Sequence, residues 1–296
     1  MLTILPRKKR RILKVFLMLL LQITVVVMIL AVCDSCKDFF SQFSSSAGPV
    51  IIPVVRYPKV EVQLGNLSRY FRPALLEYDR SAMLKTMEVF TKTLDNANMT
   101  YIMFGTTLLG SLRHMGPAPW DDGLRVIMDT DDEEKAKLVL SRLRPNYGWQ
   151  WLGDERKLRF FQEDKLATKR KEWRWPFVDV GFYDQNSTHI WEDSYHQRSY
   201  NFKKIDVFPL KRRPFDYLWP LAPRHPMATL TNFDITKCTS KNKSHKAGLS
   251  SGTVVTIDCS ILHTVYPFVR REKMGNGQVR EVLTLRRNTL KTFITE

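Results

Sequence analysis

The sequence predicts an α/β or α+β fold with a mixed sheet, placed behind one N-terminal transmembrane helix. A charge-free apolar run near the start predicts the helix. Helical and strand patterns then interleave without a regular βαβ repeat, which favours a mixed sheet over a doubly wound one. The body that remains, about 230–260 residues, is long enough for one sizeable core.

The apolar run covers residues 15–33 and contains no charged side chain. At about 1.5 Å per residue, a helix of this length crosses the hydrocarbon core of a bilayer. Basic residues 7–11 precede the run and Asp34 follows it, so the positive-inside rule leaves residues 1–14 in the cytosol. A signal peptide cleaved near residues 31–33 is the alternative, and the length of the run favours an uncleaved anchor. We expect a single-pass type II membrane protein.

Two further features agree with a lumenal body. Four asparagines stand in N-glycosylation sequons, namely Asn66, Asn98, Asn186 and Asn242. The four cysteines are too few for a disulfide scaffold. Cys238 and Cys259 are candidates for one disulfide. Cys33 and Cys36 lie at the membrane exit and are candidates for a link between two chains.

The net charge of +16 is spread along the chain. Basic clusters stand at residues 169–174, 211–213, 237–246 and 270–287. Behind a secretory anchor, this balance fits anionic substrates such as phosphorylated glycans, activated nucleotides or lipid headgroups better than nucleic acid. For any single cluster, a solvated basic surface is the simpler interpretation.

The segment before the folded body reads as a stem. Residues 34–72 are rich in serine and proline and keep no helical period. The lumenal domain is expected over residues 73–296. Its first element is an amphipathic helix at residues 81–97, with one apolar face formed by Leu84, Met87, Phe90, Thr91 and Leu94.

Shorter elements alternate after that helix. The pattern predicts a strand at residues 101–104, a helix at 106–114, a strand at 124–128 and a helix at 131–143. Acids in the first turn of the last helix suit its dipole. Further strands are predicted at residues 158–162, 177–183, 205–208 and 253–257.

Two motifs match only as strings. Gly105 and Gly110 have the spacing of a phosphate-binding P-loop, but Ser111 stands where that loop requires lysine. Residues 248–252 spell the nucleophile elbow of hydrolases around Ser250. That elbow needs a strand before the serine, but here the predicted strand follows it. Neither match indicates an ATPase or a hydrolase.

Residues 101–132 are the most informative segment. The first strand ends at Gly105, and Thr106 opens a short helix, so the turn presents N–H groups and a hydroxyl to a phosphate. Arg113 follows one helix length later and supplies positive charge. Asp121 and Asp122 then lead into the next strand, where carboxylates would meet the phosphates from the other side. A metal that bridges carboxylates to a nucleotide is the usual arrangement in phosphoryl transfer.

The sequence GTTLLGSLRH at residues 105–114, followed by PWDD at 119–122, resembles the signature of the LicD and fukutin phosphotransferases. Two later blocks agree, WPFVDVGFY at 175–183 and IDVFPL at 205–210. The resemblance implies a nucleotidyltransferase-like domain that moves a phosphorylated alcohol from a CDP-activated donor to a glycan. It also implies the Golgi or ER membrane, other lumenal transferases as partners, and no nucleic acid. The donor phosphates would contact Gly105, Thr106, Ser111 and Arg113.

In the family pattern, alternate acids after the tryptophan share one face of a strand and hold divalent ions. On this chain the first is Asp121, but Gly123 and Arg125 occupy the next two positions. Asp179 matches a further acid on a neighbouring strand. The resemblance therefore implies Mg²⁺ or Mn²⁺ in an active enzyme, held by Asp121 and Asp179. Asp122 points to the opposite face. The catalytic candidates are Asp121, Asp122 and Asp179, which could hold a metal or orient a nucleophile.

An arginine at this position repels a metal ion and can pair with a donor phosphate instead. Three functions follow as hypotheses. The first is the family's phosphotransferase activity, weakened or lost through Gly123 and Arg125. The second is a non-catalytic protein that binds a glycan or a partner transferase. The third is a nucleotide-sugar glycosyltransferase that uses Asp129 and Asp131, although a helix cap also explains these acids.

Overall fold

The computed structural model describes residues 64–164, 174–192, 201–241, 243–250, 252–275 and 277–295. The expected cytosolic tail, the expected anchor, most of the expected stem and Asn242 lie outside these ranges. Within them, no helix is both long enough and apolar enough to cross a membrane. The anchor therefore stays a prediction.

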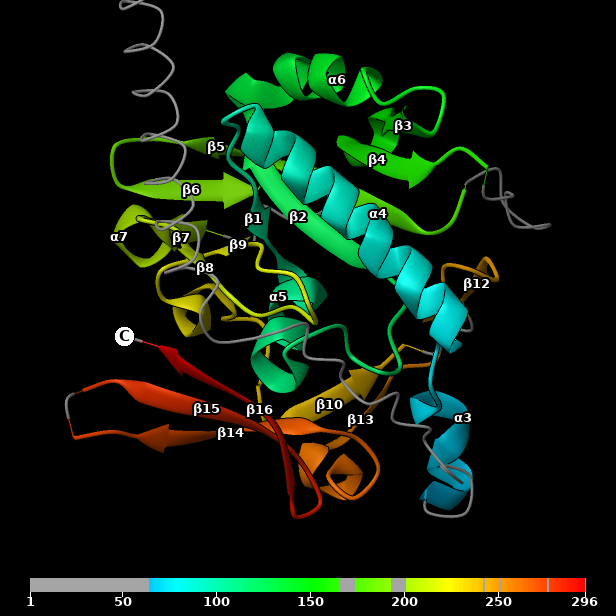
Figure 1. Ribbon diagram of the computed structural model, residues 1–296, viewed down its shortest axis with the longest axis vertical. Coiled ribbons are helices and arrows are strands. Elements are labelled where there is room, and N and C mark those ends of the chain that lie inside the picture. The colour runs from blue at the N-terminus through cyan, green and yellow to red at the C-terminus, as the bar shows by residue number, and fades with distance from the viewer. Residues whose placement is uncertain are drawn as a thin grey trace, which may run out of the picture. The chain divides into compact units, whose positions relative to one another are not determined.

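A mixed seven-stranded sheet forms the centre of the domain, as the sequence predicts (Figure 1). Its main path runs through β1 (Ile102–Met103), β2 (Leu124–Asp129), β5 (Phe177–Gln185), β4 (Lys157–Gln162) and β3 (Tyr147–Leu152). The edge beside β5 is extended by β6 (His189–Glu192) and β7 (Asn201–Lys203). Among these pairs only β2 and β5 run parallel.

The two faces of this sheet differ in character because side chains alternate along each strand. Val126 and Met128 of β2 and Val180 of β5 point into the main apolar core. On the other face, Ile127 and Tyr183 join a smaller apolar cluster, and the parallel register places Arg125 opposite Asp179. This charged part of the second face contains the site described below.

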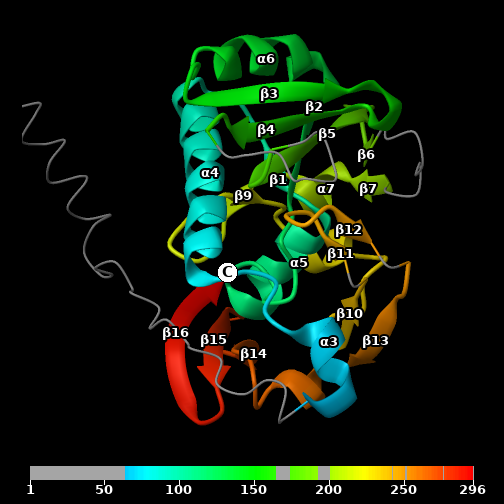
Figure 2. The ribbon, with the colours of Figure 1, turned by 90° about the vertical axis from the view of Figure 1, so that its right-hand side faces the viewer.

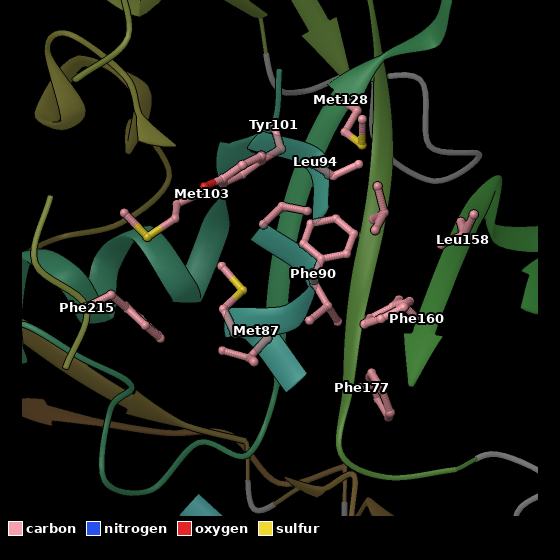
Figure 3. Packing of buried hydrophobic residues seen from close by; sticks show 14 of the residues in the cluster. Met87, Phe90, Leu94, Tyr101, Met103, Met128, Leu158, Phe160, Phe177 and Phe215 are labelled. Carbon is pink, nitrogen blue, oxygen red and sulfur yellow. The ribbon is translucent and has the colours of Figure 1, made fainter. Parts of the chain in front are cut away.

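Helix α4 (Glu77–Asn96) covers the apolar face (Figures 1 and 2). Its predicted apolar stripe is buried, which confirms the amphipathic helix, although it begins before residue 81. Figure 3 shows Met87 and Phe90 in the core near Phe160 of β4, and the two phenyl rings lie 5.6 Å apart. The predicted helix at 131–143 is divided into η2 (Thr130–Asp132) and α6 (Glu133–Ser141), and α6 packs beside α4 and β3.

Helix α5 (Gly105–His114) joins β1 to β2 and confirms the helix predicted at 106–114. Figures 1 and 2 place α5 between the seven-stranded sheet and a C-terminal sheet. That sheet consists of β14 (Phe268–Lys273), β15 (Val279–Leu285) and β16 (Asn288–Thr295). Arg271 of β14 donates to the carbonyl of Leu112 at 2.6 Å, so the sheet is tied to the C-terminal half of α5.

The strand predicted at residues 205–208 is wrong. Residues 205–207 lie in α7 (Lys204–Val207), a single helical turn that ends at Phe208, whose amide donates to the Lys204 carbonyl at 2.8 Å. Val207 is buried, but Ile205 is 67% exposed, so the short apolar run does not indicate a buried strand. The chain continues through β8 (Lys211–Arg212), β9 (Leu221–Ala222) and η4 (Pro226–Thr229).

The segment after residue 230 forms two short hairpins. In one, β10 (Lys237–Ser240) pairs with β13 (Val255–Asp258), which lies in the region of the strand predicted at 253–257. In the other, β11 (Lys243–Ser244) pairs with β12 (Leu249–Ser250). Cys238 and Cys259 form a disulfide with an S–S distance of 2.00 Å, which joins β10 to η5 (Cys259–Leu262).

The folded domain begins earlier than the expected boundary at residue 73. Residues of the expected stem form η1 (Gly65–Leu67) and α3 (Ser68–Phe71). Phe71 is fully buried, its ring lies 5.3 Å from that of Trp120, and its carbonyl accepts a hydrogen bond from the Tyr266 hydroxyl. These contacts make α3 part of the domain.

Candidate functional site

A pocket of about 830 Å³ opens between the first turn of α5, the charged face of the sheet and the hairpin segment that follows residue 230. Aromatic side chains from all three parts line it, namely Phe104, Trp120, Phe177 and Phe233. Basic side chains also line it, namely Arg113, Arg125, Lys157, Lys237, Lys241 and Lys243. Small-molecule sites have about this volume and this mixture of apolar walls and a few polar groups.

The first turn of α5 meets the start of β2 at this pocket. Gly105 has φ +55°, a conformation that glycine adopts without strain. The Arg125 backbone N–H donates to Thr107 Oγ1 at 2.7 Å, which fixes the start of the helix against the strand. Gly105 and Thr106 line the pocket, so the positive end of the helix dipole faces it.

Asp121 lies beside this turn and lines the pocket as the sequence predicts. Its Oδ1 accepts the Gly123 N–H at 3.1 Å, and Thr106 contributes a side-chain hydrogen bond. Burial raises the pKa of the Asp121 carboxyl above its usual value, while His245 opposes the rise and Asp122 adds to it. Asp121 is thus the carboxylate that faces both the phosphate-binding turn and the pocket.

Arg125 is held from one side by a buried carboxylate. Its Nη2 contacts Oε1 of Glu192 on β6, and the guanidinium lies 5.3 Å from the centre of the Phe104 ring. The Glu192 side chain is 1% exposed and that of Arg125 is 37% exposed. Burial raises the pKa of Glu192, and Arg125 opposes that rise. The remaining surface of Arg125 lines the pocket.

Asp179 lines the pocket but is already bound by two cations. Arg159 on β4 makes a two-pronged contact with it, Nε to Oδ1 at 2.7 Å and Nη2 to Oδ2 at 3.1 Å. Lys157 adds a contact to Oδ2 at 3.0 Å. Burial works against the charge of Asp179, but the two cations together hold its pKa below the usual value. Asp179 is a neutralised carboxylate in this site.

Asp122 holds the β11 loop. Its Oδ1 accepts from the His245 backbone N–H at 2.9 Å and contacts His245 Nδ1 at 2.7 Å. Its Oδ2 accepts from Ser244 Oγ at 2.9 Å and from the Lys246 N–H at 3.0 Å. Burial opposes its charge, but the bonds from His245 and Lys246 hold the pKa of Asp122 below its usual value. Asp122 is not among the residues that line the pocket.

His245 takes the space beside Gly123. A Cβ added at Gly123 would lie 2.8 Å from His245 Cε1 and 3.2 Å from Nδ1, closer than a side chain tolerates. The His245 ring also packs edge-on against Phe177, with ring centres 5.4 Å apart. The absent second acid of the family pattern is therefore matched by a histidine that fills its place.

Arg113 and Ser111 have structural partners. Arg113 donates from Nε to the Ile235 carbonyl at 3.0 Å and from Nη2 to the Asp234 carbonyl at 2.6 Å, so it fastens the hairpin segment to α5. Burial lowers the pKa of Arg113 to about 10. Ser111 lies outside the pocket lining, and its hydroxyl donates to the Pro214 carbonyl at 3.0 Å.

The residues present do not fit the carboxylate metal site that the resemblance implies. Mg²⁺ and Mn²⁺ favour oxygen ligands, and Mg²⁺ demands nearly ideal octahedral geometry. Ligand atoms of Asp121, Asp122 and His245 lie within 4.8 Å of one another, but both Asp122 oxygens already accept hydrogen bonds. Asp179 is bound by Arg159 and Lys157, and the next pattern positions are Gly123 and Arg125.

Asp129 and Asp131, the alternative metal pair, lie outside the pocket lining. Asp129 caps η2, because its Oδ1 accepts the Asp131 N–H at 3.0 Å, and Gln185 donates to its Oδ2. The cap is thus Asp129 on η2, whereas Asp132 at the start of α6 makes no side-chain capping bond. Of the sequon asparagines, Asn66, Asn98 and Asn186 are exposed.

The family comparison covers the half of the site built on the sheet. Residues 98–225 match the model of the family described as LicD/FKTN/FKRP, nucleotidyltransferase domain. This match supports membership of the LicD family. No curated protein sequence matches the chain. The matched range includes α5, β2, β4 and β5, and it supports a phosphotransferase-type family.

The other wall of the pocket comes from residues outside the matched range 98–225. This wall runs from residue 232 to 256 and supplies Lys237, Lys241, Lys243 and His245. Sequence reasoning missed these residues, and it also missed Arg159 and Glu192. One signal was present for Arg159, because it interrupts an apolar strand just as Asp179 does, and two opposite charges in neighbouring buried strands indicate a pair.

Proposed function

We propose that this LicD domain transfers a phosphorylated alcohol from a CDP-activated donor to a glycan in the lumen of the Golgi or ER, held there by the anchor at residues 15–33. The observation that carries the proposal is the convergence of the α5 first turn, Arg125 and Asp121 on one pocket within the family-matched range. A helix N-terminus and an arginine beside it are a favourable environment for phosphates.

The reaction consists of one displacement at phosphorus. An acceptor hydroxyl forms a new P–O bond to the phosphate that carries the alcohol, the P–O–P bond breaks, CMP leaves, and the hydroxyl proton passes to water. Gly105, Thr106 and Arg125 would hold the donor phosphates, because positioning and charge stabilisation supply most of this chemistry. Asp121 is placed to accept a hydrogen bond from the attacking hydroxyl and so to orient it.

The test is CMP release by the full-length protein, purified in detergent, with CDP-linked alcohols as donors and glycans as acceptors. We expect CMP to form in step with the phosphorylated glycan. Asp121→Asn should abolish turnover, and Asp129→Asn should retain it because Asp129 caps η2 away from the pocket. The absence of both CMP release and thermal stabilisation by CDP would contradict the proposal.

A second function is favoured by the pairing of Asp179. Because Arg159 and Lys157 neutralise this acid, the pocket also suits a protein that binds nucleotide without turning it over. Stabilisation by CDP without CMP release would support this non-catalytic function. It would leave a glycan or another lumenal transferase as the second ligand.

A further inference from the structure

We propose that the pocket binds the phosphates of its nucleotide directly on fixed cations, without a divalent metal ion, and that Arg125 supplies the charge a metal would supply. The inference rests on the proposed function, because a nucleotide is the ligand. It goes further because it assigns the source of positive charge and predicts independence from metal.

Four carboxylates line the pocket, namely Asp121, Glu155, Asp179 and Asp234. Three have protein partners that satisfy them. Asp179 is bound by Arg159 and Lys157, and Glu155 is bound by Lys157. Asp234 accepts hydrogen bonds from the backbone and hydroxyl of Thr236 at 2.8 and 2.6 Å. Asp121 and Asp234 are the two described lining carboxylates with no cation bound to them directly, and Asp234 is exposed and already bonded to Thr236.

Protein contacts fix the orientation of Arg125. A guanidinium presents five N–H donors in a rigid plane and binds a phosphate through two of them at once. Glu192 takes the Nη2 edge of Arg125, Phe104 supports its flat face, and its backbone is tied to Thr107. These contacts fix the guanidinium before a ligand arrives, which reduces the entropy lost on binding.

Arg125 lies beside the first turn of α5, so its charge adds to the positive end of the helix dipole. On the sheet, Arg125, Asp179 and Arg159 are register partners across three neighbouring strands and share one face. Asp179 is neutralised within this row by Arg159, and Lys241 and Lys243 from the opposite wall add positive charge that faces the pocket. An anion is the ligand that matches it.

The neighbours of positions 123 and 125 block the carboxylate metal site of the family pattern. An acid at position 123 would collide with His245, and an acid at position 125 would face the buried Glu192 across the space that Arg125 fills. Like charges placed together in a buried site destabilise each other. Acids at positions 123 and 125 would therefore also require changes at His245 and Glu192. The surroundings are built for an arginine.

The experiment is calorimetric titration of CDP into the full-length protein in detergent, once with EDTA and once with Mn²⁺. We expect the two Kd values to agree within about twofold, a difference well below the roughly tenfold change that one strong contact contributes. Cytidine, which lacks phosphates, should bind much more weakly than CDP. CDP binding that requires Mn²⁺ would overturn the inference and leave the proposed function standing. No CDP binding in either buffer would contradict both.

A matched pair of double variants tests the role of Arg125. Arg125→Gln with Glu192→Gln removes the cation without leaving a buried charge, and should weaken CDP binding in EDTA by about ten- to a hundredfold, the effect of losing charge-assisted hydrogen bonds. Arg212→Gln with Asp95→Asn removes a 3.0 Å ion pair outside the pocket lining and should leave binding unchanged. Equal affinities in the two double variants would overturn the assignment of Arg125. A melting curve confirms that each variant is folded.

Discussion

Arg125 on β2 is the ion-pair partner of Glu192 on β6, whose side chain is 1% exposed. The second carboxylate oxygen of Glu192 is buried and has no hydrogen-bond partner among the residues that the structure describes. A buried carboxylate that loses its cation must either stay charged without a partner or take up a proton, and both cost free energy. The arginine is therefore a structural requirement of this site as well as a ligand group.

The first prediction follows from that pair. Arg125→Met should lower the free energy of unfolding by about 2–4 kcal/mol, because it leaves Glu192 buried without a cation. Adding Glu192→Gln should recover part of the loss, since an amide costs less to bury than a carboxylate. Urea unfolding of the two single variants and the double variant measures the coupling. Additive losses would show that the two side chains do not interact in solution.

The second prediction concerns His114. Burial lowers the pKa of His114 to about 3, and its Nδ1 bonds to the Pro267 carbonyl at 2.7 Å. The unfolded chain therefore binds a proton near pH 6.5 that the folded protein excludes. The resulting stability is complete above about pH 6.5 and falls by about 1.4 kcal/mol for each pH unit below it.

Urea unfolding at about pH 7.5 and pH 5 checks the sign, because stability should drop by about 2 kcal/mol between them. His114→Asn, which keeps an N–H donor, should flatten this dependence. His225→Asn changes an exposed histidine and should leave it as in the native protein. A pH dependence that survives in His114→Asn would assign the proton uptake to other groups.

Elements whose apolar residues repeat with a clear period were predicted from the sequence. Elements in which charged residues interrupt that period were missed. α4 matches its pattern because most of its buried positions are apolar and helical in spacing. α5 is buried almost throughout, polar residues included. β14 and β15 were missed because Glu281 is buried between Arg213 and Arg271, at 2.5 and 2.9 Å, and such residues read as exposed. The run at 205–208 is too short for periodicity to separate helix from strand.

The candidate site shows the same division. Asp121 lies where its motif indicates, because β1, α5 and β2 are adjacent in sequence and in space. His245 lies beside Gly123 only because the chain returns after more than a hundred residues, and no local pattern reports such a return. Glu192 likewise becomes the partner of Arg125 through the pairing of β5 with β6.

The third prediction concerns the disulfide. Cys238 and Cys259 close a loop that contains β10 and β13, and β10 supplies Lys237 and Thr239 to the pocket wall. Cys238→Ala with Cys259→Ala should lower the free energy of unfolding by about 2–4 kcal/mol through the larger entropy of the unfolded chain. It should also weaken CDP binding. Cys33→Ala with Cys36→Ala is the control and should leave urea unfolding of the domain unchanged.

The fourth prediction tests the topology. If the body is lumenal, removal of N-glycans should increase the gel mobility of the protein made in secretory cells. Asn186 is the most informative sequon, because it is exposed and its Oδ1 accepts from the Thr188 N–H at 2.9 Å. Asn186→Gln and Thr188→Ala should each produce the same single mobility step, since either change destroys the sequon. Ser187→Ala leaves the sequon intact and should produce no step. An unchanged band after glycan removal would contradict the lumenal placement, and with it the anchor at residues 15–33.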